Sequence, residues 1–345
     1  MEEEIKKIAK CCQEGNHFLL ISHIDPDGDA IGSLLALGRA LKLAGKRVYM
    51  VSPDQVPIIY RFLPGWEEVV HSPEELPELY FDFDYVITLD VADRSRLGKW
   101  EWVVKHDAKV INIDHHVTNT KFGQINWIRQ AGATGQLVFM LLRQLNWEID
   151  QCIALALYTA IVTDTGSFCY ASTDSTTHQI AAELLAVGIN PTYVTELVFE
   201  SKPVAAIKLL GLALQSLEIH FAGKVATLTI TQKDLTSANA TDDDISGIVN
   251  YARGIAGVEL GILFFEKEAR LTKISFRSGL GIDVRKIAGQ FAGGGHPQAA
   301  GCQIAASLLE AQKLVLQAVS QLLTGKEGIN ERHPKYPQTT GNDIS

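Results

Sequence analysis

One histidine and three aspartates within seven residues form the feature that most constrains how this chain can fold. They read His-Ile-Asp-Pro-Asp-Gly-Asp over residues 23–29 and follow the apolar run Phe18–Ile21. Because proline and glycine interrupt regular structure, we expect a loop that leaves a strand and enters a helix over about 30–44. Three neighbouring carboxylates repel one another unless a cation neutralises them. Oxygen ligands with one neutral imidazole suit a divalent cation such as Mn²⁺.

This cluster has two simpler explanations. A calcium loop of the EF-hand type, counted from Asp25, requires glycine at its sixth position and glutamate at its twelfth. The chain has Ala30 and Ala36 there, which excludes that site. Asp29 alone could be a helix N-cap and Asp25 a turn residue. The adjacent histidine, and similar clusters further along the chain, favour a metal site over these structural roles.

Short β-type runs alternate with helical runs up to about residue 130. This alternation predicts an α/β fold with a doubly wound, mainly parallel sheet. The β-type runs are rich in valine, isoleucine and leucine, as expected for strands covered on both faces. The expected strands are 17–22, 47–51, 85–89 and 109–113.

Further acidic and imidazole residues follow these strands, at the ends where parallel sheets collect their ligands. Asp90 ends one run, and the triplet Asp114-His115-His116 ends another. Asp164 follows the apolar helix expected over 152–161. Each has a simpler alternative, namely a turn residue, a solvated turn or the end of a helix. Adjacent residues that leave a strand point in different directions, so in the triplet one residue can bind metal while its neighbours orient it or face substrate.

Composition limits the class of protein. The chain has 345 residues, which is enough for two domains with ordinary cores. Its net charge of −9 argues against a protein that coats long nucleic acids by bulk electrostatics. The longest apolar run, 152–162, is too short to span a bilayer, and the five cysteines form no C-x-x-C pair. We expect a cytoplasmic protein without membrane contact.

The second half of the sequence mixes strand and helix patterns and carries two possible phosphate-binding features. The glycine run before His296 includes Gly294 and Gly295, whose amides could cradle phosphate oxygens, although such runs are more often hinges. Arg277 and Ser278 follow the expected strand 271–276 and add a bidentate donor and a hydroxyl. Helices are expected at about 243–254, 283–291 and 306–323. The expected domains are 1–195, a helical linker 196–216, a second domain 217–325 and a disordered tail 326–345.

These motifs together resemble a known family. The order His-x-Asp-x-Asp-Gly-Asp, a strand-terminal aspartate, Asp-His-His and Thr-Asp-Thr-Gly is similar to the four motifs of the DHH phosphoesterases. The run Gly-Gly-Gly-His-Pro-Gln-Ala-Ala-Gly over 293–301 resembles the signature of the associated DHHA1 domain. Length and layout resemble the bacterial group that combines oligoribonuclease and 3′-phosphoadenosine 5′-phosphate phosphatase activities.

The resemblance implies a catalytic DHH domain, a smaller α/β DHHA1 domain and a cleft between them. It implies two Mn²⁺ ions, with Mg²⁺ or Co²⁺ as substitutes, one held by His23, Asp27 and Asp90 and the other by Asp29, Asp90, His115 and Asp164. Asp114 would support the metal ligands, His116 would face the phosphate or the leaving group, and Asp25 would be a further residue beside the ligands. Nucleotide recognition would fall to Arg277, Ser278, Gly294, Gly295 and His296. The implied substrates are short oligonucleotides and small phosphorylated nucleotides, and the implied assembly is a homodimer.

Other functions stay open on the sequence alone. A family II type inorganic pyrophosphatase shares the first domain but not the glycine-histidine run. A single-strand DNA exonuclease needs a longer basic groove than this acidic chain suggests. A phosphodiesterase for linear or cyclic dinucleotides uses the same phosphate chemistry. From another class, a nucleotide-sensing module could retain the metals without turnover, and a substrate panel with Mn²⁺ would distinguish it from an enzyme.

Overall fold

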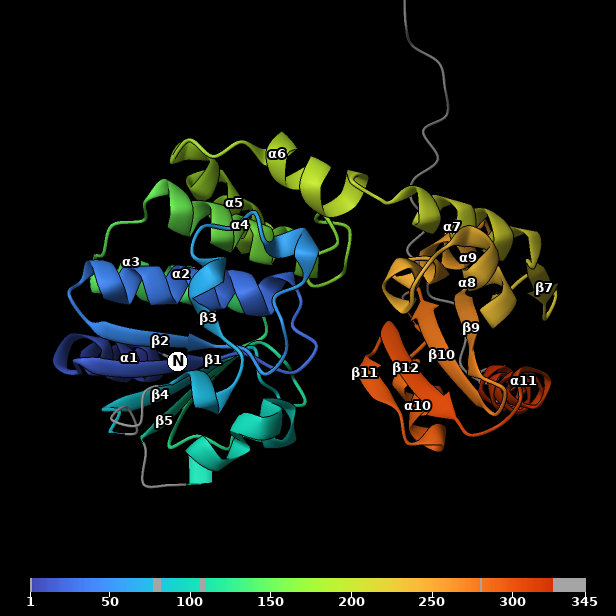
Figure 1. Cartoon of the computed structure of the whole chain (residues 1–345), viewed down its shortest axis with the longest axis horizontal. Helices are drawn as coiled ribbons and strands as arrows, with labels where there is room; N and C mark the ends of the chain where they lie inside the picture. Colours follow the sequence, from blue (N-terminus) through green and yellow to red (C-terminus); the bar gives the residue numbers. More distant parts are fainter. Residues whose placement is uncertain (1, 77–81, 106–108, 280, 325–345) are drawn as a thin grey trace, which may run out of the picture. The chain divides into compact units, whose positions relative to one another are not determined.

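The chain forms two compact units, with the division between Ser201 and Lys202 (Figure 1). The computed structural model describes residues 2–76, 82–105, 109–279 and 281–324. The tail expected over 326–345 lies outside these residues. Within them, no helix has both the length and the apolar character needed to cross a bilayer.

The first unit is built on a six-stranded sheet in which every pairing is parallel. Its strand order is β3-β2-β1-β4-β5-β6, so the order reverses between β1 and β4. The predicted parallel α/β sheet is confirmed, and the two short strands β3 and β6 are additions to it. The strands are β1 His17–Ile21, β2 Arg47–Val51, β3 Val69–Val70, β4 Tyr85–Leu89, β5 Val110–Asp114 and β6 Ile125–Ile128.

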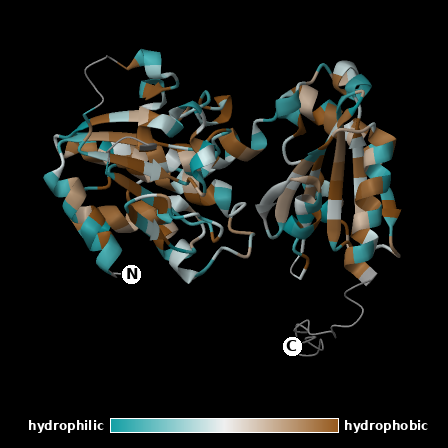
Figure 2. Cartoon of the chain, turned by 90° about the horizontal axis from the view of Figure 1, so that it is seen from below, coloured by the Kyte–Doolittle hydropathy of each residue, from teal (hydrophilic) through white to brown (hydrophobic). Residues whose placement is uncertain are grey.

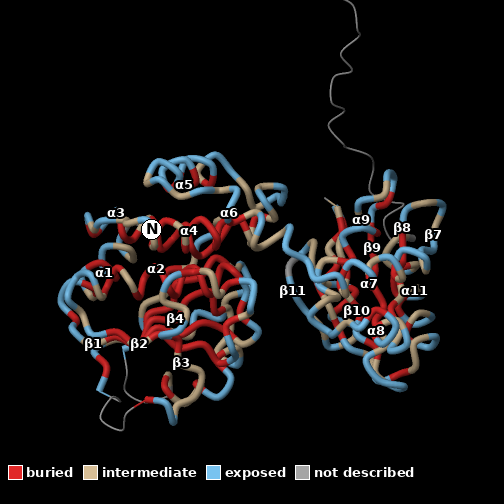
Figure 3. The backbone as a smooth tube through the Cα atoms, turned by 45° about the horizontal axis from the view of Figure 1, so that its top comes forward, coloured by how far each residue is buried: buried red, intermediate tan, exposed pale blue. Residues whose placement is uncertain are grey.

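Helices cover one face of this sheet, and irregular 3₁₀ segments cover the other. On the helical face, Phe18, Leu20 and Ile87 pack with the apolar sides of the long helices. On the opposite face, Leu19 and Val86 pack around Trp100, whose side chain is fully buried. Figure 2 shows the apolar residues along the strands, and Figure 3 shows how deeply they are buried. The helices are α1 Glu2–Glu14, α2 Gly28–Leu43, α3 Thr134–Leu145, α4 Gln151–Asp164, α5 Ser175–Ala186 and α6 Pro191–Thr195. The other helical segments are η1 Ile58–Tyr60, η2 Trp66–Glu68, η3 Pro73–Glu75, η4 Arg94–Lys105 and the π-helix η5 Glu196–Glu200.

Two glycines on α2 let α4 approach it closely. A Cβ atom on Gly32 would lie 2.4 Å from the Ala156 carbonyl oxygen, and one on Gly28 would lie 2.4 Å from Thr163 Oγ1. The two glycines are four residues apart and therefore lie on the same side of α2. This contact brings Asp164, the last residue of α4, close to the start of α2, which begins at Gly28 rather than near Ala30.

The second unit is built on a six-stranded mixed sheet in the order β11-β12-β10-β9-β8-β7. All of its pairings are antiparallel except β8 with β9. Alternate residues of its long strands enter two separate cores, with Ile262 and Phe276 on one face and Leu263 and Phe265 on the other. The strands are β7 Glu218–His220, β8 Val225–Ile230, β9 Leu260–Glu268, β10 Leu271–Ser278, β11 Gly294–His296 and β12 Ala299–Ile304.

The helices of the second unit are shorter and more broken than the sequence predicts. The helix expected over 243–254 is split at Gly247, whose positive φ of 81° ends one segment before the next begins. The helix expected over 283–291 contains only one α-helical turn. The segment expected as linker is divided, because α7 packs through Leu209 onto the second unit. The segments are α7 Val204–Gln215, α8 Gln232–Ala238, η6 Asp242–Ile245, α9 Val249–Arg253, α10 Arg285–Ala288, η7 Gly289–Phe291 and α11 Leu308–Thr324.

Candidate metal centre

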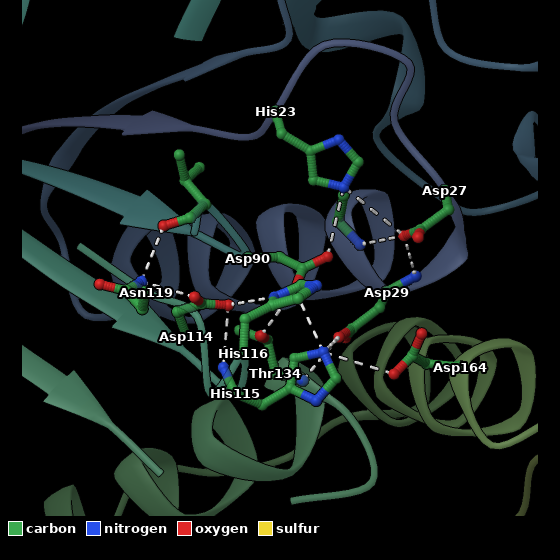
Figure 4. A network of polar contacts seen from close by, with 12 residues as sticks. His23, Asp27, Asp29, Asp90, Asp114, His115, His116, Asn119, Thr134 and Asp164 are labelled. Atoms are coloured by element: carbon green, nitrogen blue, oxygen red, sulfur yellow. Dashed lines mark hydrogen bonds and ion pairs between the residues drawn. The ribbon is translucent and has the colours of Figure 1, made fainter. Parts of the chain in front are cut away.

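Acidic and imidazole residues gather where the strand order of the first sheet reverses, at the carboxyl ends of β1, β4 and β5 (Figure 4). Open α/β sheets bind their ligands at this point. His23 and Asp27 lie on the loop after β1, and Asp90 lies directly after β4 in a left-handed conformation with φ of 62°. A non-glycine residue in this conformation costs about 1 to 3 kcal/mol, and such residues cluster at functional sites.

The first group with metal-ligand geometry contains His23, Asp27 and Asp90. His23 Nε2 lies 3.3 Å from Asp90 Oδ2 and 3.9 Å from Asp27 Oδ1. His23 Nδ1 donates to the Ile24 carbonyl oxygen at 2.7 Å, which leaves Nε2 facing the carboxylates. Asp27 is exposed, so this group opens toward solvent, and its Oδ1 also caps α2 by accepting from the amides of Asp29 and Ala30.

The second group contains Asp29, His115 and Asp164. His115 Nε2 lies 3.4 Å from Asp164 Oδ2 and 3.9 Å from Asp29 Oδ2. His115 Nδ1 donates to the Ala131 carbonyl oxygen at 3.1 Å. Both histidines therefore direct Nε2 to the carboxylates while Nδ1 is held by a backbone carbonyl, which is the arrangement typical of metal-binding histidines.

Asp90 lies between the two groups. Its Oδ2 is 3.3 Å from His23 Nε2, and its Oδ1 is 3.5 Å from His115 Nε2. One carboxylate with its two oxygens directed toward different groups is suited to bridge two cations. The structure therefore brings together all six residues for which the sequence predicted metal ligation.

Asp114 and His116 lie beside these two groups and form a third one with Asp90 and His115. His116 Nδ1 donates to Asp114 Oδ1 at 2.7 Å and lies 3.5 Å from Asp90 Oδ1. Asp114 Oδ1 also accepts the amide of His115, and Asp114 Oδ2 accepts from Asn119 Nδ2 at 2.5 Å. Because hydrogen bonds occupy both of its oxygens, the fully buried Asp114 serves to hold His116 and the backbone of His115 in place.

Burial and mutual charge shift the pKa values of the cluster strongly. Burial alone lowers the pKa of a histidine, but the charges of Asp90 and its neighbours raise the pKa of His23 to about 9 and that of His115 to about 10. Burial and the charge of Asp90 raise the pKa of Asp29 well above its usual value, and burial raises that of Asp164 to about 7. Although burial opposes it, the hydrogen bond from His23 and the surrounding imidazolium charges lower the pKa of Asp90. Divalent cations can replace these protons as the neutralising charge, so the donor set fits divalent metal binding.

The start of α3 holds two of these carboxylates, and the sequence did not predict it. The amides of Thr134 and Gly135 donate to Asp29 at 2.6 and 2.8 Å, and Thr134 Oγ1 donates to Asp90 Oδ1 at 3.0 Å. Exposed amides at a helix N-terminus favour a carboxylate. The only sequence signal was the small-residue stretch Ala-Gly-Ala-Thr-Gly over 131–135.

Arg96 is a second residue of the site that the sequence did not predict. Its Nη2 atom donates to the Ile24 carbonyl oxygen at 3.1 Å and lies 2.9 Å from His23 Nδ1, while its own carbonyl accepts the amide of Ile24. Arg96 thus holds the carbonyl that orients the His23 ring. Asp25, by contrast, does not join the cluster, because its side chain is exposed and its amide donates to Asp54. Asp25 is therefore not part of the groups with metal-ligand geometry among the described residues.

Comparison with known proteins agrees with this geometry. Residues 17–161 match the DHH family, N-terminal domain, and residues 222–325 match the DHHA1 domain. The bifunctional oligoribonuclease and PAP phosphatase NrnA of Thermus thermophilus is 36% identical over 307 residues, 88% of this chain and 90% of that protein. The chain belongs to the DHH family. Together with the buried donor set, this membership makes it a metal-dependent phosphoesterase.

A further relative and two solved structures extend this comparison. NrnA of Bacillus subtilis is 25% identical over 292 residues, which cover 83% of this chain and 88% of that protein. An exopolyphosphatase-related protein from Bacteroides fragilis has a solved structure with a TM-score of 0.90 at 26% identity, covering 95% of this chain and 98% of that one. A structure of the exonuclease RecJ bound to manganese has a TM-score of 0.52 at 14% identity, covering 92% of this chain and 94% of that chain, and shares the fold alone.

The DHHA1 unit holds the remaining predicted residues in and around its sheet. Arg277 and Ser278 are the last residues of β10, so this strand is longer than the sequence predicts. Ser278 Oγ donates to the Ile282 carbonyl oxygen at 2.6 Å and closes the loop after the strand. Gly294 and Gly295 lie in the edge strand β11 and pair with Gly301 and Ala300. His296 follows them in β11, but its side chain lies outside the described part of the chain.

Proposed function

We propose that this DHH protein hydrolyses short oligonucleotides of about two to five residues to mononucleotides, and 3′-phosphoadenosine 5′-phosphate to AMP. The observation that carries this proposal is the position of Asp90 between two metal-ligand groups at the reversal point of the sheet. The substrate class is supported by the likeness to NrnA of Thermus thermophilus, which extends over both units and carries both activities in its name.

We assign one Mn²⁺ to His23, Asp27 and Asp90, and a second to Asp29, Asp90, His115 and Asp164. Manganese is proposed over magnesium because each set contains one imidazole, whereas Mg²⁺ prefers oxygen ligands in a regular octahedron. When bound, such a pair of cations supplies an activated hydroxide at neutral pH and neutralises charge on the phosphoryl oxygens.

The residues of the chain prepare this chemistry. Asp114 fixes the His116 ring by accepting from Nδ1, and the charge of Asp90 at 3.5 Å stabilises a proton on the same ring. The Asp114 hydrogen bond, acting against burial, raises the pKa of His116. We assign His116 to the phosphate or the leaving group, where a held proton offsets developing negative charge. Arg96 and Thr134 hold the side chains of His23 and Asp90 in position.

We assign nucleotide binding to the DHHA1 unit. Arg277 supplies a bidentate donor for phosphate. Gly294 and Gly295 lie on an edge strand, whose amides that face away from β12 suit phosphate oxygens. His296 follows them in the same strand. Ser278 contributes by shaping the loop that follows Arg277, because its hydroxyl hydrogen is donated to Ile282.

The test is a substrate panel with the full chain and Mn²⁺. Diadenylate and 3′-phosphoadenosine 5′-phosphate should both be hydrolysed, with AMP as a product measured by chromatography. Mg²⁺ at the same concentration should support a lower rate. Metal-loaded protein that binds these nucleotides but releases no product would identify a sensing module and refute the proposal.

The fold shared with RecJ makes a single-strand exonuclease the second candidate. With a net charge of −9, this chain should gain little from added phosphates, because little counterion release accompanies their binding. A dinucleotide should therefore have a higher kcat/KM than a chain of about 24 nucleotides with the same terminus, and a shallow salt dependence. Faster, processive degradation of the long chain with a steep salt dependence would favour the exonuclease.

We also propose a homodimer, to be measured by sedimentation.

A further inference from the structure

The register of the second sheet places a row of small residues beside Arg277. Arg277 pairs with Gly261 on β9 and with Ala299 on β12. Directly paired residues of neighbouring strands direct their side chains to the same face of the sheet. Leu263, two residues after Gly261, packs in the same core as Val249 and Ala252 of α9. The row with Arg277 therefore faces α9.

Arg253, the last residue of α9, lies over this row and depends on two glycines for its position. A Cβ atom on Gly261 would lie 2.6 Å from the amide nitrogen of Arg253. A Cβ atom on Gly279 would lie 2.4 Å from Arg253 Nη2 and 3.2 Å from Arg253 Cζ. The guanidinium of Arg253 therefore rests against the backbone of Gly279, two residues after Arg277 and on the face to which Arg277 is directed.

The hydrogen bonds of Arg253 leave part of its guanidinium without a protein acceptor. Nη1 donates to the Val258 carbonyl oxygen at 3.0 Å. The buried Nε has no hydrogen-bond acceptor among the residues that the structure describes. Arg285 in the same unit differs, because its guanidinium makes two hydrogen bonds to Asp283. A half-buried cation that has no carboxylate partner in the described ranges of the chain favours an anionic ligand, since burial of an unpaired charge is costly.

We propose that Arg253 is a second phosphate-binding residue of the DHHA1 unit, which binds a phosphate group of the nucleotide together with Arg277. This inference rests on the proposed function and extends it, because it makes the unit selective for nucleotides that carry a phosphate over nucleosides. Gly261 and Gly279 are required because a side chain at either position would occupy the place of Arg253.

The experiment measures binding of AMP and of adenosine by calorimetry, with the full metal-loaded chain. Arg253→Ala should weaken AMP binding about tenfold or more and leave adenosine binding unchanged. Gly279→Ala should do the same at little cost in stability, because the atom that the new methyl group meets is the end of a flexible side chain. Gly289→Ala is the matched control, since a Cβ there meets nothing within 4 Å. In an Arg253→Ala background, Gly279→Ala should have no further effect.

Equal losses for AMP and adenosine, unchanged AMP binding in Arg253→Ala, or a wild-type chain that does not prefer AMP would each overturn the inference. Hydrolysis of bis-nitrophenyl phosphate, which reports on the metal centre, separates this result from the proposed function. A chain that hydrolyses this ester while binding AMP and adenosine equally contradicts only the role of Arg253. A chain that prefers AMP through Arg253 but hydrolyses nothing contradicts only the proposed function.

Discussion

The two six-stranded sheets of this chain expose their charged side chains very differently. In the first, all strands are parallel, and Asp29, Asp90 and Asp114 are almost fully buried at their carboxyl ends. In the second, most strands are antiparallel, and the described acidic and basic residues are at least partly exposed. A parallel sheet directs every carboxyl end to one edge, so it can concentrate ligands there. An antiparallel sheet distributes strand ends over two edges, and its binding residues meet through register across the strands instead.

This comparison predicts that only the first unit binds metal. The substitution Asp90→Ala should have the largest effect on metal binding. Loss of the shared carboxylate should remove both cations and lower hydrolysis of bis-nitrophenyl phosphate by about a thousandfold or more. His23→Ala should mainly weaken one cation. Mass spectrometry of bound metal gives the stoichiometry, and Asp25→Ala is the matched control outside the cluster. Unchanged metal content in Asp90→Ala would disprove the bridging role.

When metal is added, amide hydrogen exchange should become slower in the first unit and stay unchanged in the second. Ligands that bind only the folded state stabilise it by about 2.7 kcal/mol at a hundredfold excess over Kd, which is about a hundredfold in exchange protection. Amides of α2 and of the start of α3 should gain this protection, because Asp29 connects them. Amides of β9 and β10 should not change. Equal gains in both units would mean that the metal also orders the second unit.

Arg277→Ala should weaken nucleotide binding by the second unit and leave the metal centre of the first unit unchanged. Loss of a bidentate charge-assisted contact costs about 1.5 to 3 kcal/mol, so kcat/KM for diadenylate should fall about tenfold to a hundredfold. Metal content and hydrolysis of bis-nitrophenyl phosphate should be unaffected. Arg285→Ala is the matched control, because that side chain is paired with Asp283. An equal loss on both substrates would place Arg277 in the chemical step.

The pH dependence of metal binding should show the raised histidine pKa values of the first unit. The pKa values of His23 and His115 are raised to about 9 and about 10, so metal-free protein retains both protons at neutral pH. A metal requires the neutral ring and displaces the proton, so affinity should rise about tenfold per pH unit for each proton and level off above these pKa values. Calorimetry in buffers of different ionisation enthalpy should detect proton release. Affinity independent of pH from 6 to 8 would contradict the assignment.

The sequence by itself determined which residues of the first unit meet. The carboxyl ends of parallel strands lie along one edge of the sheet whatever their separation along the chain, so the sequence could place His23, Asp90 and His115 at the same edge. The helices of the second unit were predicted less well. The sequence predicted one continuous helix over 243–254, but Gly247 interrupts it. The periodicity of apolar residues along the chain does not indicate where a helix is interrupted.

Only the tertiary structure decided how these residues are held and which of their neighbours take part. Thr134 reaches Asp29 across 105 positions, and Arg96 reaches His23 across 73, through packing that no local pattern encodes. The roles of Asp114 and Asp25, one fully hydrogen-bonded and the other exposed, depend on side-chain direction at the end of a strand or within a loop. Arg253 is placed by register and by two glycines on other segments. The physical reason is that strand order fixes positions to within a few residues, whereas hydrogen bonds require atomic distances that only the packed core sets.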